Sequence, residues 1–232
     1  MRVVKTAIVE SVNNYIKESL RDSPEKLLFN KIAVFVKDPL PEDVDVDYVL
    51  SSIEKRVPEH LAYGVDMIYI GQFEEFDARD TNAAYKDGAL YVTNEQSDED
   101  DMIDDIVHEM SHACEETYHS LIYADGKIQN EFIGKRKRLH EILKTEEYKV
   151  SLEDFLNTEY SREFDEFLYK EVGYEKLTFF TMGLFVSPYG ATSYREYFAN
   201  GFEHYFLNDP QYVRVVSPAV YDKVDGLVFM EI

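Results

Sequence analysis

The chain has 232 residues, of which 45% are hydrophobic and 14% aromatic, so it is long and apolar enough to fold around a substantial core. Its formal net charge of −22 argues against a nucleic-acid partner, because proteins that bind a phosphate backbone need a basic face. No stretch reaches the roughly 18 uninterrupted apolar residues of a membrane span, so we expect no membrane partner.

The compartment and the domain count follow from local composition. The N-terminus becomes acidic and polar too early for a secretory signal, and a single cysteine, Cys114, rules out an internal disulfide framework. We therefore expect a cytoplasmic protein, with secretion left open if a signal was removed. Because no repeat or linker interrupts the sequence, we expect one domain over residues 1–232. The oligomeric state is not indicated.

The first part of the chain alternates between helical and strand patterns. Residues 1–20 carry apolar side chains at helical spacing, and 31–37 is a short run rich in β-branched residues, which is typical of a buried strand. A helix is predicted over 45–56, before Pro58, and a second strand over 65–71.

A hairpin and several helices are predicted next. Residues 81–93 contain two β-prone runs around an Asp87-Gly88 turn. Acidic residues at 97–101 favour a helix N-terminus, 127–176 has helical apolar spacing, and a last helix covers 193–207. This order predicts an α+β fold with a small mixed sheet followed by helices.

One segment carries a metal-binding pattern. His108, Glu109 and His112 form H-E-x-x-H on a predicted amphipathic helix. Residues four apart share a helix face, so the two imidazoles converge on one point, and Glu109 lies beside it as a candidate general base. A chain with six histidines can also contain this pattern by chance, as a pair of hydrogen-bonded helix histidines.

A catalytic zinc site needs a third protein ligand and an open position for water. The pattern that continues to a third histidine is rejected, because Glu115 and Tyr118 occupy its glycine and histidine positions. A glutamate on a later helix is the remaining common solution, and Glu196 supplies one. The small residues Ala199 and Gly201 would let its helix approach the motif helix closely.

The segment Tyr189–Phe202 resembles the active-site segment of the gluzincin family that includes the anthrax toxin lethal factor catalytic domain and the Pro-Pro endopeptidases. The resemblance implies a zincin-like metallopeptidase domain, with an active-site helix and a C-terminal helix that carries the glutamate ligand. It also implies that Tyr189, seven residues before Glu196, is catalytic. Asn82-Ala83-Ala84 resembles the substrate-binding edge strand of this class. The match covers roughly residues 80–120 and 185–207.

The sequence departs from that family in two places. Asn200 stands where a second glutamate is usual, so we expect Asn200 to be the residue behind a ligand histidine. About eighty residues separate His112 from Glu196, more than in those relatives, which implies a helical insertion at about 125–176.

The remaining candidates are interpreted as structural. We expect Glu203, His204 and the basic run 135–138 to lie on solvated helix faces, the last in preference to a targeting signal. We expect Cys114 to be a small buried hydrophobic residue. The other histidines have no partner at ligand spacing and are expected to be structural or exposed: His60, His119 and His140.

The sequence thus predicts a zinc-dependent endopeptidase that hydrolyses peptides or proteins. His108, His112 and Glu196 hold Zn²⁺, Glu109 and Tyr189 are catalytic, and residues 82–84 bind the substrate. Three alternatives stay open: a zinc-binding module without peptidase activity, a zinc hydrolase of a non-peptide amide, and a helical protein that binds no metal.

Overall fold

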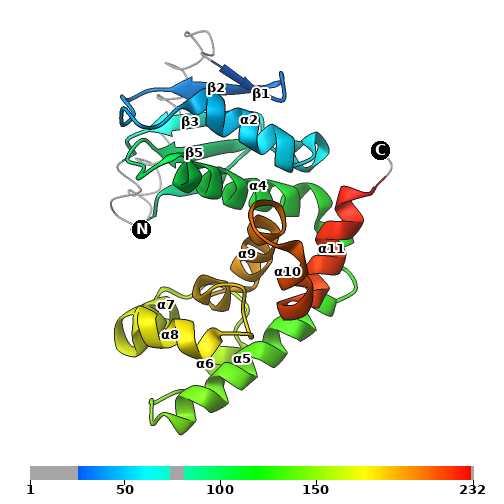
Figure 1. The fold of residues 1–232 in the computed structure, drawn as a ribbon. Helices are drawn as coiled ribbons and strands as arrows, with labels where there is room; N and C mark the ends of the chain where they lie inside the picture. Colours follow the sequence, from blue (N-terminus) through cyan, green and yellow to red (C-terminus); the bar gives the residue numbers. More distant parts are fainter. Residues whose placement is uncertain (1–25, 74–80, 231–232) are drawn as a thin grey trace, which may run out of the picture.

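The computed structural model describes residues 26–73 and 81–230, so the helix predicted for residues 1–20 lies outside the described part. The fold is α+β, with a mixed sheet at one end and a set of helices at the other (Figure 1). The long helix α4 (Glu99–Tyr123) runs along the sheet and separates it from the later helices.

The described sheet has five strands in the order β1-β2-β3-β5-β4. The three inner strands are parallel to one another, whereas each edge strand runs antiparallel to the inner strand beside it. Their bounds are β1 Lys26–Leu28, β2 Ile32–Val36, β3 Met67–Gly71, β4 Ala83–Lys86 and β5 Ala89–Thr93. The predicted strands and hairpin are confirmed, while the short β1 was not predicted.

The hairpin turn forms because Asp87 and Gly88 both adopt positive φ, at 51° and 83°. This left-handed conformation at both central residues matches the right-handed twist of the flanking strands. The turn brings β4 to the edge of the sheet, beside α4.

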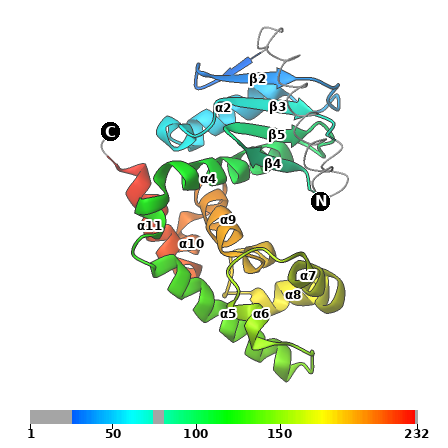
Figure 2. The ribbon, with the colours of Figure 1, turned by 180° about the vertical axis from the view of Figure 1, so that it is seen from behind.

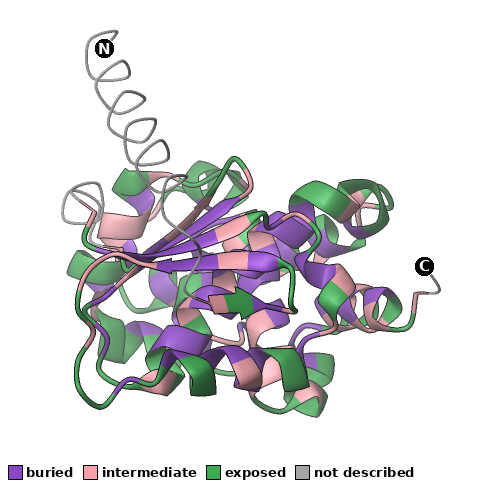
Figure 3. Cartoon of the chain, turned by 90° about the horizontal axis from the view of Figure 1, so that it is seen from above, coloured by how far each residue is buried: buried purple, intermediate pink, exposed green. Residues whose placement is uncertain are grey.

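Both faces of the central strands are buried, as Figure 3 shows by their purple stretches. One face, with Val34, Ile68 and Leu90, belongs to the main core, which also contains residues of α4 and of α2 (Val46–Arg56). The other face carries stacked rings of Phe35, Tyr69 and Tyr91, one from each parallel strand. Strands buried on both faces read as continuous apolar runs, which is why the sequence identified them.

The helices after α4 form the second part of the structure (Figure 2). A 3₁₀ turn, η3, covers Pro188–Ala191 and a π-helical segment, η2, covers Phe167–Gly173, whereas the 3₁₀ turn η1 (Glu59–Ala62) precedes α4. The helices are α5 Lys127–Thr145, α6 Leu152–Leu156, α7 Arg162–Glu166, α8 Tyr174–Thr181, α9 Tyr194–Leu207, α10 Pro210–Val216 and α11 Pro218–Val228. The predicted segment 127–176 is therefore helical but broken by loops.

Helix α9 occupies the centre of this part, because it packs against α4, η3, α10 and α11. The prediction that Gly201 faces the motif helix is wrong. A Cβ atom at Gly201 would lie 2.5 Å from Cγ1 of Val220, so this glycine permits close approach to α11 instead.

The basic run on α5 is only half solvated, which corrects the prediction made for it. Lys137 and Arg138 are exposed, but Lys135 and Arg136 point inward. The Lys135 ammonium donates to the carbonyl of Val216 at 2.5 Å, and Arg136 is only 1% exposed. No helix in the described part is both long and apolar enough to cross a membrane.

The turn at Gly64 offers a test of how tightly the sheet and α4 are joined. A Cβ atom there would lie 2.6 Å from the carbonyl oxygen of Ala113, next to His112 on α4. We expect Gly64→Ala to lower the free energy of unfolding by about 1–3 kcal/mol in urea denaturation, because α4 must shift.

Gly134→Ala is the matched control. Gly134 lies inside α5, and a Cβ atom there meets nothing within 4 Å. It should raise stability by about 0.5–1 kcal/mol, because alanine loses less backbone entropy. Equal effects of both substitutions would contradict the tight contact at Gly64.

Candidate metal centre

The H-E-x-x-H pattern lies in the middle of α4, where its apolar residues are buried against the sheet. The Asp98 side chain caps the helix by accepting from the amide of Asp101 at 3.0 Å. His108 and His112 are one turn apart and their ring centroids are separated by 5.3 Å. The helix therefore presents two imidazoles on one side, as the spacing predicts.

Helix α9 brings Glu196 between these imidazoles. The Nε2 atom of His108 lies 3.0 Å from Oε2 of Glu196, and that of His112 lies 3.7 Å from Oε1. One ligand atom from each residue lies within 4.8 Å of the other two, so the group could hold a metal ion. Ser193 fixes this position, because its hydroxyl accepts from the Glu196 amide at 3.2 Å at the start of α9.

The outer nitrogen of each imidazole meets a second carboxylate. Nδ1 of His108 lies 3.0 Å from Oε2 of Glu203, and Nδ1 of His112 lies 2.6 Å from Oε2 of Glu115. An ionised carboxylate can only accept, so these contacts favour a proton on Nδ1 of each ring. With a metal bound, Nε2, which faces Glu196, would supply the lone pair. Both rings are therefore oriented for metal binding.

Glu115 is itself held from two sides. Its side chain is 3% exposed, and Nε of Arg195 donates to Oε2 at 3.2 Å. The Tyr123 hydroxyl donates to the other carboxylate oxygen. Arg195 directly precedes Glu196, so the same helix supplies a metal-ligand candidate and a residue that fixes the partner of His112.

The structure corrects two predictions about the residues behind the histidines. Among the described hydrogen bonds, the ring nitrogens of His108 and His112 bond to glutamates, whereas the side-chain oxygen of Asn200 accepts from the Ser187 hydroxyl. Glu203, predicted to be solvated, takes that role at His108. Seven residues make almost two helical turns, so Glu203 returns to the face of Glu196. That spacing, and the three residues from His112 to Glu115, are the sequence signals that could have identified both glutamates.

The charges in the site support one another. Burial opposes a charged imidazole, but hydrogen bonds to Glu196 and Glu203 outweigh it and raise the pKa of His108. Burial would likewise raise the pKa of both glutamates, yet the hydrogen bond to His108 lowers the pKa of each. The two carboxylates therefore stay ionised on opposite sides of the His108 ring.

Glu109 points toward the sheet edge. The backbone amide of Tyr85 in β4 donates to Oε2 of Glu109 at 2.6 Å. Burial raises the pKa of Glu109, and the neighbouring His112 and His108 oppose that rise. A desolvated carboxylate held at one oxygen keeps the other free to exchange a proton beside the ligand group.

The predicted substrate-binding residues lie on or beside β4, which has a described strand on only one side. The carbonyl of Asn82 accepts from the Thr93 amide and therefore faces β5. Ala83 pairs with Val92 and Ala84 with Tyr91. The Tyr85 amide, bonded to Glu109, points away from β5. The outer edge of β4 thus runs past the general-base candidate.

Tyr189 lies in η3, directly before α9, with its ring centroid 6.1 Å from that of His108. It is 45% exposed. Partial burial, together with the negative charges of Glu196 and Asp165, raises the pKa of its phenol. The hydroxyl therefore stays protonated at neutral pH and can donate a hydrogen bond.

The other histidines interpreted as structural, and Cys114, lie outside the ligand group in the described part. Nε2 of His60 lies 2.8 Å from the carbonyl of Leu227, and His140 packs edge-on against Phe155. His119 is exposed beside Tyr123. Cys114 is fully buried, and burial raises the pKa of its thiol, which disfavours a thiolate nucleophile.

No known protein family, curated protein or solved structure matches this chain. The centre combines three convergent metal-ligand candidates, an adjacent buried carboxylate and a strand edge beside which no described strand lies.

The carboxylates behind the histidines give a test of the centre. We expect Glu203→Gln and Glu115→Gln each to weaken binding of a divalent metal by about 10- to 100-fold, because a neutral amide is a weaker acceptor for the ring N–H than a carboxylate. Affinity would be measured by competition with a chromophoric chelator. Glu116→Gln, on an exposed position of α4, should change it less than about twofold. Equal affinities for all three variants would remove both glutamates from the centre.

Proposed function

We propose that this protein is a zinc-dependent endopeptidase with a zincin-like fold. The observation that carries the proposal is the shared orientation of His108 and His112, whose Nε2 atoms both face Glu196 while their Nδ1 atoms face carboxylates. The proposed substrates are peptides or proteins.

The donor set fits zinc. Two nitrogens and a carboxylate oxygen are ligands that Zn²⁺ accepts, and three protein ligands are typical of catalytic sites. Ligand atoms roughly 2.0–2.2 Å from a tetrahedral ion lie about 3.3–3.5 Å apart. The Nε2 atoms of His108 and His112 lie 3.0 and 3.7 Å from the two oxygens of the Glu196 carboxylate, which is of the same order. When bound, zinc would lower the pKa of a coordinated water and polarise a carbonyl group.

Glu109 supplies the proton transfer. It directly follows a ligand candidate, and its fixed oxygen is anchored to the Tyr85 amide. It would accept a proton from the attacking water and deliver it to the leaving amine. Its raised pKa favours both steps, because a base whose pKa approaches the working pH can also act as an acid.

Tyr189 and the β4 edge would act on the substrate. The protonated phenol is suited to donate to the oxyanion that develops on the scissile carbonyl. An extended peptide could add to the outer edge of β4 through main-chain hydrogen bonds, which would place its backbone beside Glu109. The same edge would select peptides over small amides.

The decisive experiment is a digest of a peptide library, with bound metal quantified on the same sample. Peptide cleavage that stops with a chelator and returns with zinc supports the proposal. Bound zinc without cleavage would instead support a binding or assembly module. Cleavage of small amides alone would support a non-peptide hydrolase, and a protein without metal would reject the site.

Substituting Glu109 separates the base from the ligands. We expect Glu109→Gln to retain one zinc per chain but to lower turnover by at least about 100-fold, because only proton transfer is removed. His112→Ala should lose both metal and activity. Loss of zinc from Glu109→Gln, measured by elemental analysis, would show that Glu109 is a ligand.

Substituting Tyr189 tests transition-state stabilisation. We expect Tyr189→Phe to keep zinc and to leave KM within about twofold while kcat falls by about 100- to 1000-fold, the usual effect of losing an oxyanion donor. An unchanged kcat, measured where chemistry limits the rate, would assign Tyr189 a structural role at the edge of the site.

A further inference from the structure

A buried guanidinium, that of Arg136, joins the segment directly before α9 to the predicted insertion. Arg136 projects from α5 and is 1% exposed. Its Nη1 atom donates to the carbonyls of Ala191 at 2.6 Å and Thr192 at 3.2 Å. Its Nη2 atom donates to the carbonyls of Asp154 at 2.5 Å and Asn157 at 3.4 Å. One side chain therefore ties together two loops distant in sequence.

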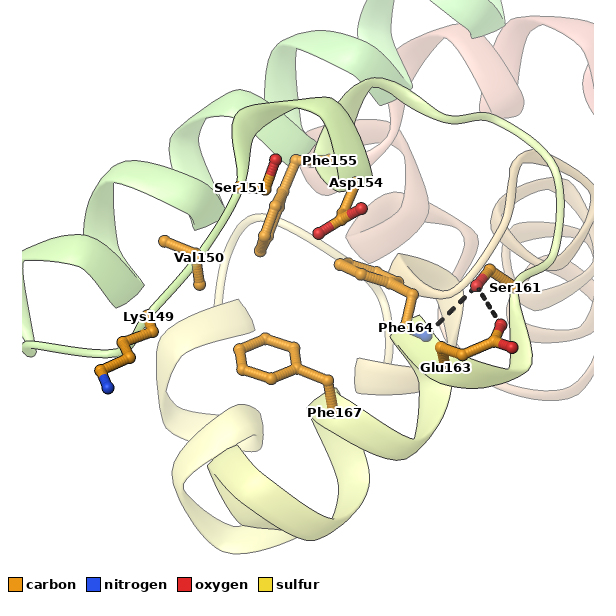
Figure 4. Close-up of a pocket in the computed structure, with 9 residues that line it drawn as sticks. All are labelled: Lys149, Val150, Ser151, Asp154, Phe155, Ser161, Glu163, Phe164 and Phe167. Atoms are coloured by element: carbon orange, nitrogen blue, oxygen red, sulfur yellow. Dashed lines mark hydrogen bonds between the residues drawn. The ribbon is translucent and has the colours of Figure 1, made fainter.

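Aromatic rings hold the guanidinium in place. Its central carbon lies 4.0 Å from the ring centroid of Phe164, and the rings of Phe132 and Phe155 lie at 5.3 and 5.5 Å. Phe155 and Phe164 also line a cavity of about 170 Å³ in the insertion, where Figure 4 shows them beside Asp154. Burial lowers the pKa of Arg136 to about 9, so the side chain is still cationic at neutral pH.

The carbonyls of Ala191 and Thr192 belong to the segment that connects Tyr189 to Glu196. The Thr192 hydroxyl and amide both bond to the Tyr189 carbonyl, at 2.7 and 2.9 Å. The insertion supports this connection a second time, because the Thr158 carbonyl accepts from the amide of Tyr194 at 2.9 Å. Arg136 therefore acts on Tyr189 through Thr192.

We infer that Arg136 is a positioning residue that sets the place of the Tyr189 phenol over the metal centre. The inference rests on the proposed peptidase function, and it assigns the helical insertion a part in catalysis. An ionised, planar fork is suited to the task, because it can reach four carbonyls at once. A lysine ammonium retains the charge but has no second arm.

The test compares Arg136→Lys with Arg138→Lys, the same change at an exposed position of the same helix. Both full-length, zinc-loaded variants are assayed on a peptide that the wild type cleaves. We expect Arg136→Lys to lower kcat by about 10- to 100-fold, the scale of a small misplacement, with zinc content unchanged and KM within about twofold. Arg138→Lys should match the wild type. A full kcat in Arg136→Lys overturns the inference.

A double-mutant cycle separates positioning from general destabilisation. In a Tyr189→Phe background the Arg136→Lys change should alter kcat by less than about twofold, because the group it positions is gone. An equal loss in both backgrounds overturns the inference. If Arg136→Lys does not fold, Thr192→Val replaces it: this change removes the hydroxyl bonded to the Tyr189 carbonyl, and its effect should vanish in the same background.

Hydrogen exchange distinguishes a failure of this inference from a failure of the proposed function. If the wild type cleaves no peptide, the proposed function fails. Amide exchange over residues 187–194 then still reports on the anchor. Faster exchange there in Arg136→Lys than in Arg138→Lys, with the sheet unchanged, supports positioning of the turn by Arg136. Equal exchange in the two variants overturns it.

Discussion

The site depends on the packing of α9 against α4, because a single carboxylate on α9 has to lie between two imidazoles on α4. Neither helix carries a complete ligand set alone. The approach of α9 is fixed from behind by α11, which meets Gly201 at a distance that leaves no room for a Cβ atom. The approach of α4 is fixed from the other side by the sheet and by the turn at Gly64. The relative positions of the three ligand candidates therefore depend on the close contacts at Gly201 and Gly64.

Buried charge at this contact is arranged in alternation. Each imidazole lies between an inward carboxylate, Glu196, and an outward one, and Arg195 adds a cation behind Glu115. An unpaired buried carboxylate destabilises the folded state. Removing one member of a buried pair is destabilising for the same reason, because the partner's charge is then uncompensated. The alternation lowers the pKa of Glu196 and Glu203 despite their burial. In an acidic chain, where most carboxylates repel one another, such pairing keeps these glutamates ionised in the interior.

Features that follow from local periodicity could be predicted from the sequence. The apolar stripe and the four-residue spacing on α4 identified His108 and His112, and helical spacing together with a missing third ligand pointed to Glu196. The structure places these three side chains together. The structure also confirms the predicted α+β class and the small mixed sheet. Local patterns do not reveal the roles of Glu203, Glu115 and Arg136, because the burial of these side chains depends on elements far away in the chain. A basic run such as 135–138 looks solvated until another loop covers half of it.

Helix α5 shows why the predicted insertion is more than an appendage of the fold. Its two inward-pointing cations, Lys135 and Arg136, are adjacent in sequence, yet they bind different segments that pack against α9. Lys135 donates to the carbonyl of Val216 and the hydroxyl of Ser217, where α10 meets α11 behind α9. Arg136 donates to the carbonyls of Ala191 and Thr192, which directly precede the first turn of α9. Burial lowers the pKa of both groups, a cost that backbone carbonyls and aromatic rings offset. Helix α5 therefore bonds both to the α10–α11 junction, which packs against α9, and to the segment that begins α9. A displacement of α5 would shift both supports and, with them, the position of Glu196.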